Sequence, residues 1–133
     1  MKDLKSRVKF MEAAAPAVAK ADIEGEDIDL KGYRSCLFEA VIGAGAYETG
    51  KEVEIVLEES DDGTTYTAVD EDHYDGDLSA VDDTLAADEY REIQYHGYKR
   101  YARLSFDVTG TLAADVLLGA WVILGHPHLA PTT

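Results

Sequence analysis

Residues 51–60, KEVEIVLEES, decide the fold class because apolar and acidic side chains alternate along most of their length. On an extended chain Val53, Ile55 and Leu57 point to one side and the glutamates between them point to the other. The following SDDGTT has the Asp-Gly chemistry of a tight turn, and TYTAV at 65–69 returns as a second strand. The sequence therefore predicts a β-hairpin over residues 51–69.

Further strands are predicted on both sides of this hairpin. The apolar run at 35–42 is typical of a central strand, EIQYHGY at 92–98 begins another, and YARLSFDVTG at 101–110 alternates cleanly. The last strand, ADVLLGAWVILG at 114–125, is apolar on both sides. Six or seven strands with no helix between them predict an all-β fold, an antiparallel β-sandwich or jelly-roll-like barrel. We expect its core to contain Val53, Ile55, Leu57, Leu104, Phe106 and Trp121.

The two ends of the chain differ from the predicted sandwich in charge and pattern. Residues 1–20 carry a net charge of +3, and residues 21–133 carry −18. Apolar residues at 4, 8, 11 and 15 have helical spacing, which predicts a short amphipathic helix from about Asp3 to Ala15 that ends at Pro16, with an extended arm as the alternative. We divide the chain into an N-terminal arm (1–20), a β-sandwich domain (21–125) and an extended C-terminal tail (126–133). An isolated helix of this length is marginal in water, so the arm must dock on another surface, either the acidic body of its own chain or a neighbouring copy. The arm residues expected to make that contact are Lys2, Leu4, Lys5, Arg7, Val8, Lys9 and Met11.

Composition excludes several classes of function. The formal charge of −15 over 133 residues repels phosphate backbones and anionic lipids, so we expect no nucleic acid and no membrane as partner. No stretch is long and apolar enough to cross a bilayer, and no signal peptide is visible, which indicates a protein made in a reducing cytoplasm. The single cysteine, Cys36, lies in the most apolar strand and is expected to be an unreactive core side chain.

No set of catalytic residues is present, and we expect no enzyme activity and no cofactor. The acidic tract 70–88 contains no Lys or Arg and suggests a solvated surface loop or a patch that faces a partner. Its carboxylates Asp70, Asp72, Asp75 and Asp77 are weak candidates for a cation site, because their spacing does not match the EF-hand loop. His126 and His128 could both point one way on an extended chain, but no third ligand is near, so a packed tail is favoured over a metal site.

Aromatic residues suggest another class of protein, a carbohydrate-binding module. The chain has eight tyrosines and one tryptophan, and sugar sites lay aromatic faces against sugar rings. The EESDDGTTYTAV hairpin also occurs in many sandwich domains of that class, although the same residues simply make a good turn. Trp121 lies among apolar residues and is expected in the core.

Four segments taken together resemble a known family. DLKGYRSCLFEAVIGA, VEIVLEESDDGTTYTAV, YHGYKRYARLSFDVTGT and GAWVILGHPHLAP follow one another over roughly residues 28–131. In this order they are similar to small structural proteins encoded in the head-gene region of tailed bacteriophages and prophages.

The resemblance implies a non-enzymatic virion component with a β-sandwich, a capsid cement or decoration protein or the base of a head fibre. The implied partners are the major capsid protein or other virion proteins and copies of the chain itself. The implied location is the virion capsid, after assembly in the bacterial host cytoplasm. A carbohydrate-binding sandwich for host attachment and a head-tail connector or tail component are the alternatives.

Overall fold

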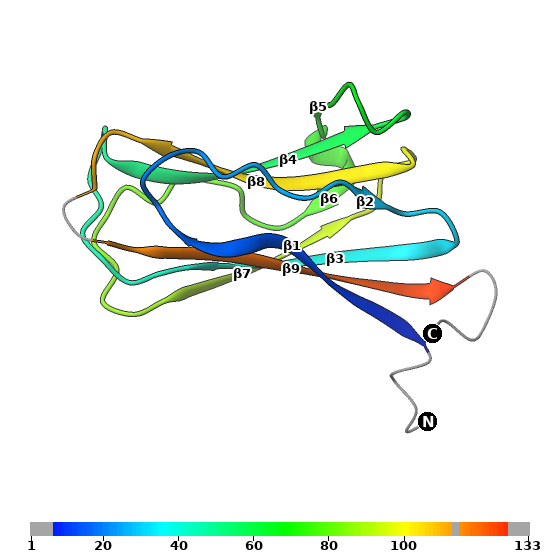
Figure 1. Cartoon of the computed structure of the whole chain (residues 1–133), viewed down its shortest axis with the longest axis horizontal. Coiled ribbons are helices and arrows are strands. Elements are labelled where there is room, and N and C mark those ends of the chain that lie inside the picture. The colour runs from blue at the N-terminus through cyan, green and yellow to red at the C-terminus, as the bar shows by residue number, and fades with distance from the viewer. Residues whose placement is uncertain (1–6, 113–114, 128–133) are drawn as a thin grey trace.

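Two antiparallel β-sheets packed face to face form the molecule (Figure 1). The computed structural model describes residues 7–112 and 115–127. Sheet A, the lower layer in Figure 1, contains in spatial order β1 (Val8–Val18), β9 (Leu117–Pro127), β3 (Tyr33–Ile42), β7 (Glu89–Tyr95) and β6 (Tyr74–Asp75). Sheet B contains β2 (Ile28–Asp29), β8 (Tyr101–Thr109), β4 (Glu52–Ser60) and β5 (Thr67–Ala68). A single turn of 3-10 helix, η1 (Glu71–His73), precedes β6. The expected all-β sandwich is confirmed.

The core lies between the two sheets and is built from alternate residues of the long strands. Sheet A contributes Phe38 and sheet B contributes Phe106, and neither exposes any surface to solvent. The expected core residues Val53, Ile55, Leu57, Leu104 and Phe106 are all buried. Among the described residues no helix is long and apolar enough to cross a membrane.

Trp121 is a correction to the expected core. It is only partly buried, and its register partners on the neighbouring strands are Glu12 and Glu39. Gly119 lies beside it on the same side of β9: a Cβ built on Gly119 would be in ordinary van der Waals contact with the tryptophan ring, at 3.6 Å, and with Pro16, at 3.5 Å. Strand β9 is apolar on both sides, as expected, but the side that carries Trp121 faces away from sheet B.

The N-terminal helix is also wrong from Val8 onward, where the chain forms β1. This strand pairs with β9 from Val8↔Gly125 to Val18↔Leu117, with irregular register after Glu12 and again after Ala14. Pro16 lies in the irregular part of this edge strand, where a missing amide hydrogen is tolerated. Ala13 and Ala14 are buried, so pairing and burial outweigh the helical spacing of the apolar residues.

The hairpin predicted over 51–69 is confirmed as β4 and β5. Register pairs Glu58↔Ala68 and Glu59↔Thr67 join the two strands. In the turn, Oδ1 of Asp62 accepts hydrogen bonds from the backbone amides of Thr64 and Thr65, at 2.8 and 2.9 Å. These hydrogen bonds hold the turn closed at the Asp-Gly sequence, and they also lower the pKa of Asp62 to about 2.

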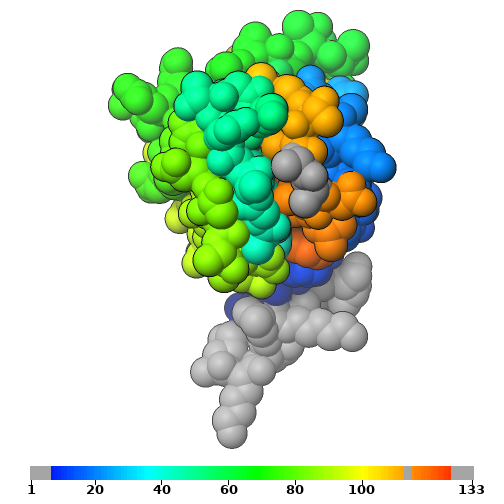
Figure 2. Space-filling view, turned by 90° about the vertical axis from the view of Figure 1, so that its left-hand side faces the viewer, coloured from blue at the N-terminus to red at the C-terminus, as the bar shows by residue number. Residues whose placement is uncertain are grey.

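The acidic tract 70–88 is more ordered than the expected surface loop. It contains η1 and β6, and Val81 exchanges backbone hydrogen bonds with Val53 of sheet B. Arg91 secures the tract from β7, because its Nη1 donates to the carbonyl oxygen of Ser79 at 2.6 Å. Farther along, Leu85 pairs with Gly45. Figure 2 shows the yellow-green segment from the second half of the tract packed against the blue-green segment near residues 45–50. The tract therefore connects the two sheets, because β6 pairs within sheet A and Val81 bonds to sheet B.

The first two residues of the expected tail, His126 and Pro127, belong to strand β9. Strand β9 continues through His126 to Pro127, whose register partner is Tyr33 of β3. Among the described residues, pairing with β1 extends as far as Gly125. Residues 128–133 lie outside the described part.

Candidate functional site

The most distinctive surface of the described chain is the side of sheet A that points away from sheet B. Register places the outward side chains in rows across β1, β9, β3 and β7. Phe10 and Tyr90 expose 63% and 64% of their surface on this side, and Leu117 exposes 59%. We call this surface the outer face; it consists of Phe10, Glu12, Leu37, Glu39, Val41, Tyr90, Glu92, Gln94, Leu117, Trp121 and Ile123.

Carboxylates lie across the middle of the outer face. The register partners Glu12↔Trp121, Trp121↔Glu39 and Glu39↔Glu92 form one continuous row. None of these glutamates makes an ion pair with a residue in the described ranges. By contrast, Glu58 on sheet B faces Arg103 and binds it at 2.9 Å. The outer face therefore combines apolar side chains with carboxylates that no described cation neutralises.

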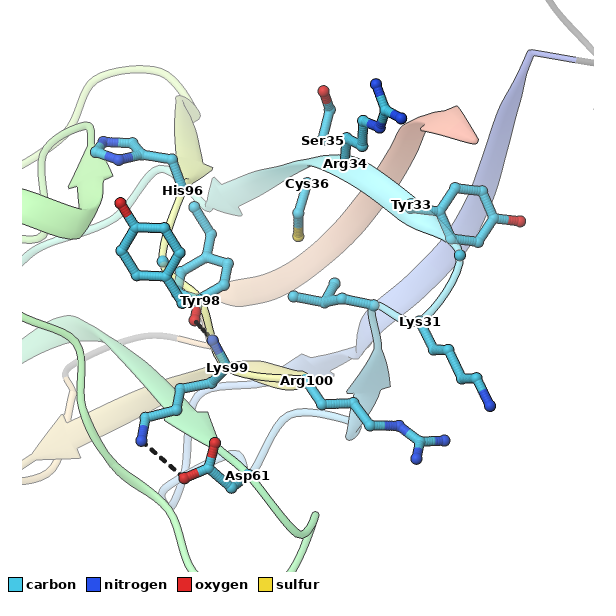
Figure 3. Close-up of a pocket in the computed structure, with 14 residues that line it drawn as sticks. Lys31, Tyr33, Arg34, Ser35, Cys36, Asp61, His96, Tyr98, Lys99 and Arg100 are labelled. Carbon is cyan, nitrogen blue, oxygen red and sulfur yellow. Dashed lines mark hydrogen bonds and ion pairs between the residues drawn. The ribbon is translucent and has the colours of Figure 1, made fainter. Parts of the chain in front are cut away.

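A pocket of about 670 Å³ lies at the end of the sandwich where β3 and β8 begin (Figure 3). Tyr95 forms part of its wall, and the hydroxyl of Tyr95 donates to Oε1 of Glu59 at 2.7 Å. Tyr98 stands at the rim with 90% of its surface exposed, and its ring meets the ring of His73 edge to face, with centroids 5.6 Å apart. An exposed aromatic ring beside a pocket can stack on a flat or ring-shaped ligand.

Basic side chains surround the pocket opening. Lys99 is neutralised by Asp61, whose Oδ2 lies 2.7 Å from Nζ, and Arg100 is held by both carboxylate oxygens of Asp29. Lys31 and Arg34 form no ion pair with any residue in the described ranges. The pocket can therefore offer cations and an aromatic ring to a polar ligand. Its lining comes from three separate parts of the chain, 30–36, Asp61 and 95–100, so local sequence patterns could not reveal it.

Cys36 lies in the pocket wall with its sulfur directed inward, as Figure 3 shows. Only 3% of the residue is exposed, and burial raises the pKa of its thiol from 9.0 to about 12. The thiol is therefore protonated at neutral pH and is a poor nucleophile. The expectation of a buried core cysteine is confirmed.

Alkaline pH should destabilise the protein partly through Cys36. Its folded pKa lies above its unfolded pKa, so this contribution to stability is complete below pH 9 and is lost as the pH rises toward about 12. We expect the melting temperature to fall over this range, with a shallower fall in Cys36→Ala. Tyr47, whose pKa burial raises to about 12, adds to the fall and is unchanged in the variant. Parallel pH profiles of the two proteins would contradict a role for the thiol.

The weak cation candidates have other partners in the structure. The carboxylate of Asp77 accepts from the amide of Ser79 and lies 4.0 Å from Arg91, and that of Asp75 lies 3.6 Å from Nε2 of His96. Across residues 7–112 and 115–127 no three potential metal ligands gather in one place. Asp70 directly precedes η1, and Asp72 is part of it. Both residues are exposed.

The expected arm residues fall into two groups. Lys2, Leu4 and Lys5 lie outside the described part. Arg7 and Lys9 are exposed, whereas Val8 and Met11 are partly buried in β1. Of the histidine pair, Nδ1 of His126 hydrogen-bonds Oγ of Ser35 at 2.5 Å, and His128 is outside the described residues.

No family model and no curated protein matches this sequence. Among solved structures, the PBSX exported protein XepA is 18% identical with a TM-score of 0.56; the match covers all of this chain and 42% of that one. The SPBc2 prophage-derived protein YomS is 19% identical with a TM-score of 0.45, covering 87% of this chain and 94% of YomS. The tripod from the baseplate of bacteriophage Tuc2009 is 12% identical with a TM-score of 0.44, and the match covers 95% of this chain and 68% of the tripod chain. At such identities the likeness to XepA shows a shared fold.

Proposed function

We propose that this chain is a non-enzymatic structural protein of a tailed-phage particle, a cement or decoration protein that stabilises the head shell. It contacts the major capsid protein or other virion proteins, and copies of the chain contact one another. It is made in the bacterial host cytoplasm and resides in the virion capsid.

The outer face carries this proposal. Large apolar side chains exposed together on one sheet are typical of a surface that another protein covers. The exposed Phe10, Tyr90 and Leu117 lie with the partly buried Trp121 on one side of sheet A, while the domain as a whole carries strong negative charge. The motif resemblance to phage head proteins agrees with this role, and the fold shared with XepA is compatible with it.

A carbohydrate-binding module for host attachment is the second candidate, and the pocket favours it. Tyr98 offers an exposed ring at the rim, and Lys99 and Asp61 supply polar groups beside it. A head-tail connector or tail component is a third role within the particle, and it would differ from a cement protein in copy number and position.

We expect the purified chain to bind phage head shells that lack it and to raise the temperature at which they rupture. Trp121→Ala should weaken this binding, because the indole lies in the middle of the outer face. Tyr98→Ala at the pocket is the matched aromatic control and should bind shells normally. Rupture is followed by calorimetry, and quantitative mass spectrometry of particles should find a copy number near that of the major shell protein.

The outcome that contradicts the cement role is equally specific. A chain that leaves shell rupture unchanged but gives a glycan-array signal, lost in Tyr98→Ala and retained in Trp121→Ala, would be a sugar-binding module. A copy number far below that of the shell protein would place the chain at a connector or in the tail.

A further inference from the structure

The row of carboxylates on the outer face is unfavourable in the isolated chain. Glu39 and Glu92 lie directly opposite one another on β3 and β7, and like charges in this position destabilise a sheet. Glu12 extends the row on the far side of Trp121. A cation placed between Glu39 and Glu92 would remove the repulsion.

Apolar side chains flank the carboxylate row on both sides. Two residues away along the strands in one direction lie the register partners Phe10, Ile123 and Leu37, and the polar Gln94 follows Leu37 at the β7 end of that row. Two residues away in the other direction lie Val41 and Tyr90. Two residues of extended chain span about 7 Å. The face therefore has an acidic row between two rows of mainly apolar side chains at this spacing, and Gln94 is the polar end of the first of these rows.

A second copy of this chain fits the outer face poorly. Face-to-face pairing would bring two carboxylate rows together between two chains that each carry −15. Apolar contact alone would have to overcome that repulsion. Charge complementarity instead favours a different protein with a basic, apolar surface.

We propose that the outer face binds a segment of a different protein chain, one that presents a Lys or Arg flanked by apolar side chains about 7 Å away on each side. The cation lies between Glu39 and Glu92, and the apolar groups cover the two apolar rows around Trp121. The inference rests on the proposed assembly function and specifies the partner surface that this function needs.

The test uses the full-length protein and two synthetic β-hairpin peptides as probes. One peptide presents Leu-x-Arg-x-Val on a face, and the other has Glu in place of Arg. We expect calorimetry to detect binding of the Arg peptide and not of the Glu peptide. The double variant Glu39→Gln with Glu92→Gln should weaken binding by about tenfold or more, and Trp121→Ala should also weaken it. Because the double variant removes repulsion, its melting temperature should be equal to or higher than that of the wild type.

A matched control is present on sheet B. Glu54 and Asp107 are also opposite one another and point away from the core, but their neighbours on that face are mainly polar. The double variant Glu54→Gln with Asp107→Asn changes the net charge by the same amount and should leave peptide binding within about twofold of the wild type. An equal loss of peptide affinity in both double variants would mean that the peptide responds only to the net charge of the protein, and this would overturn the proposal.

Two further outcomes would also overturn it. Equal affinity for the Arg and Glu peptides would mean that the carboxylate row does not distinguish a cation from an anion. Sedimentation showing a dimer that Trp121→Ala dissociates would mean that a second copy occupies the face. Failure of the assembly function is distinguishable, because the chain would then be absent from particles while the Arg peptide still bound the outer face.

Discussion

Replacement of Phe106 by alanine should lower the free energy of unfolding by about 3–5 kcal/mol. Phe106 is fully buried in the middle of β8 and faces Ile55 across the strand pair. Its removal leaves a cavity that the surrounding strands cannot fill without breaking their register. Because a domain of this size has about 5–15 kcal/mol of stability in all, the variant should unfold at much lower urea concentration.

Phe10→Ala is the matched control for this prediction. The chemical change is identical, but Phe10 exposes 63% of its surface on the outer face. We expect its urea midpoint to stay close to that of the wild type. Similar midpoints for the two variants would mean that Phe106 does not occupy the core position described here.

The sandwich could be predicted because its longest strands have an unambiguous side-chain period. Val53, Ile55 and Leu57 alternate with glutamates, so only one register of β4 buries the apolar set. Strand β9 carries no such signal. It is apolar on both sides, and sequence alone could not tell that Trp121 belongs to the outer face, because that depends on which side of β9 sheet B covers.

The N-terminal strand illustrates a different limit. Apolar residues at helical spacing favour a helix as long as the segment is considered alone. In the fold, Ala13 and Ala14 are buried and the backbone of β1 pairs with β9, and neither contact can be inferred from the first 20 residues. Tertiary pairing overrides local pattern here.

The candidate sites depend on long-range pairing in the same way. The row from Glu12 to Glu92 joins four strands, so its like charges become visible only once the register is known. The pocket similarly joins Lys31 and Tyr98 from separate connections. The charge difference between the chain ends was visible in the sequence, but the surface to which a basic partner would bind was not.

Deletion of residues 1–15 should prevent the protein from folding cooperatively. The deletion removes most of β1, including the buried Ala13 and Ala14, and exposes the backbone edge of β9. The amide of Glu26 also loses its acceptor, the carbonyl oxygen of Ala13, at 2.7 Å. The combined loss should exceed that of a single core truncation, which is about 3–5 kcal/mol. Thermal melts followed by circular dichroism, with size-exclusion chromatography to detect aggregation, measure it.

Deletion of residues 1–6 is the control, and it separates the two roles that the N-terminus could have. This shorter deletion leaves all of β1 in place, so we expect the same melting temperature as the full chain. Because it removes Lys2, Leu4 and Lys5, weaker self-association in this variant would assign those residues to contacts between copies, independently of the fold. A cooperative melt near the wild-type temperature after deletion of 1–15 would contradict the role of β1, since the sandwich would then fold without its edge strand. Aggregation of the longer deletion alone would instead support it, because the uncovered edge of β9 can pair with another chain.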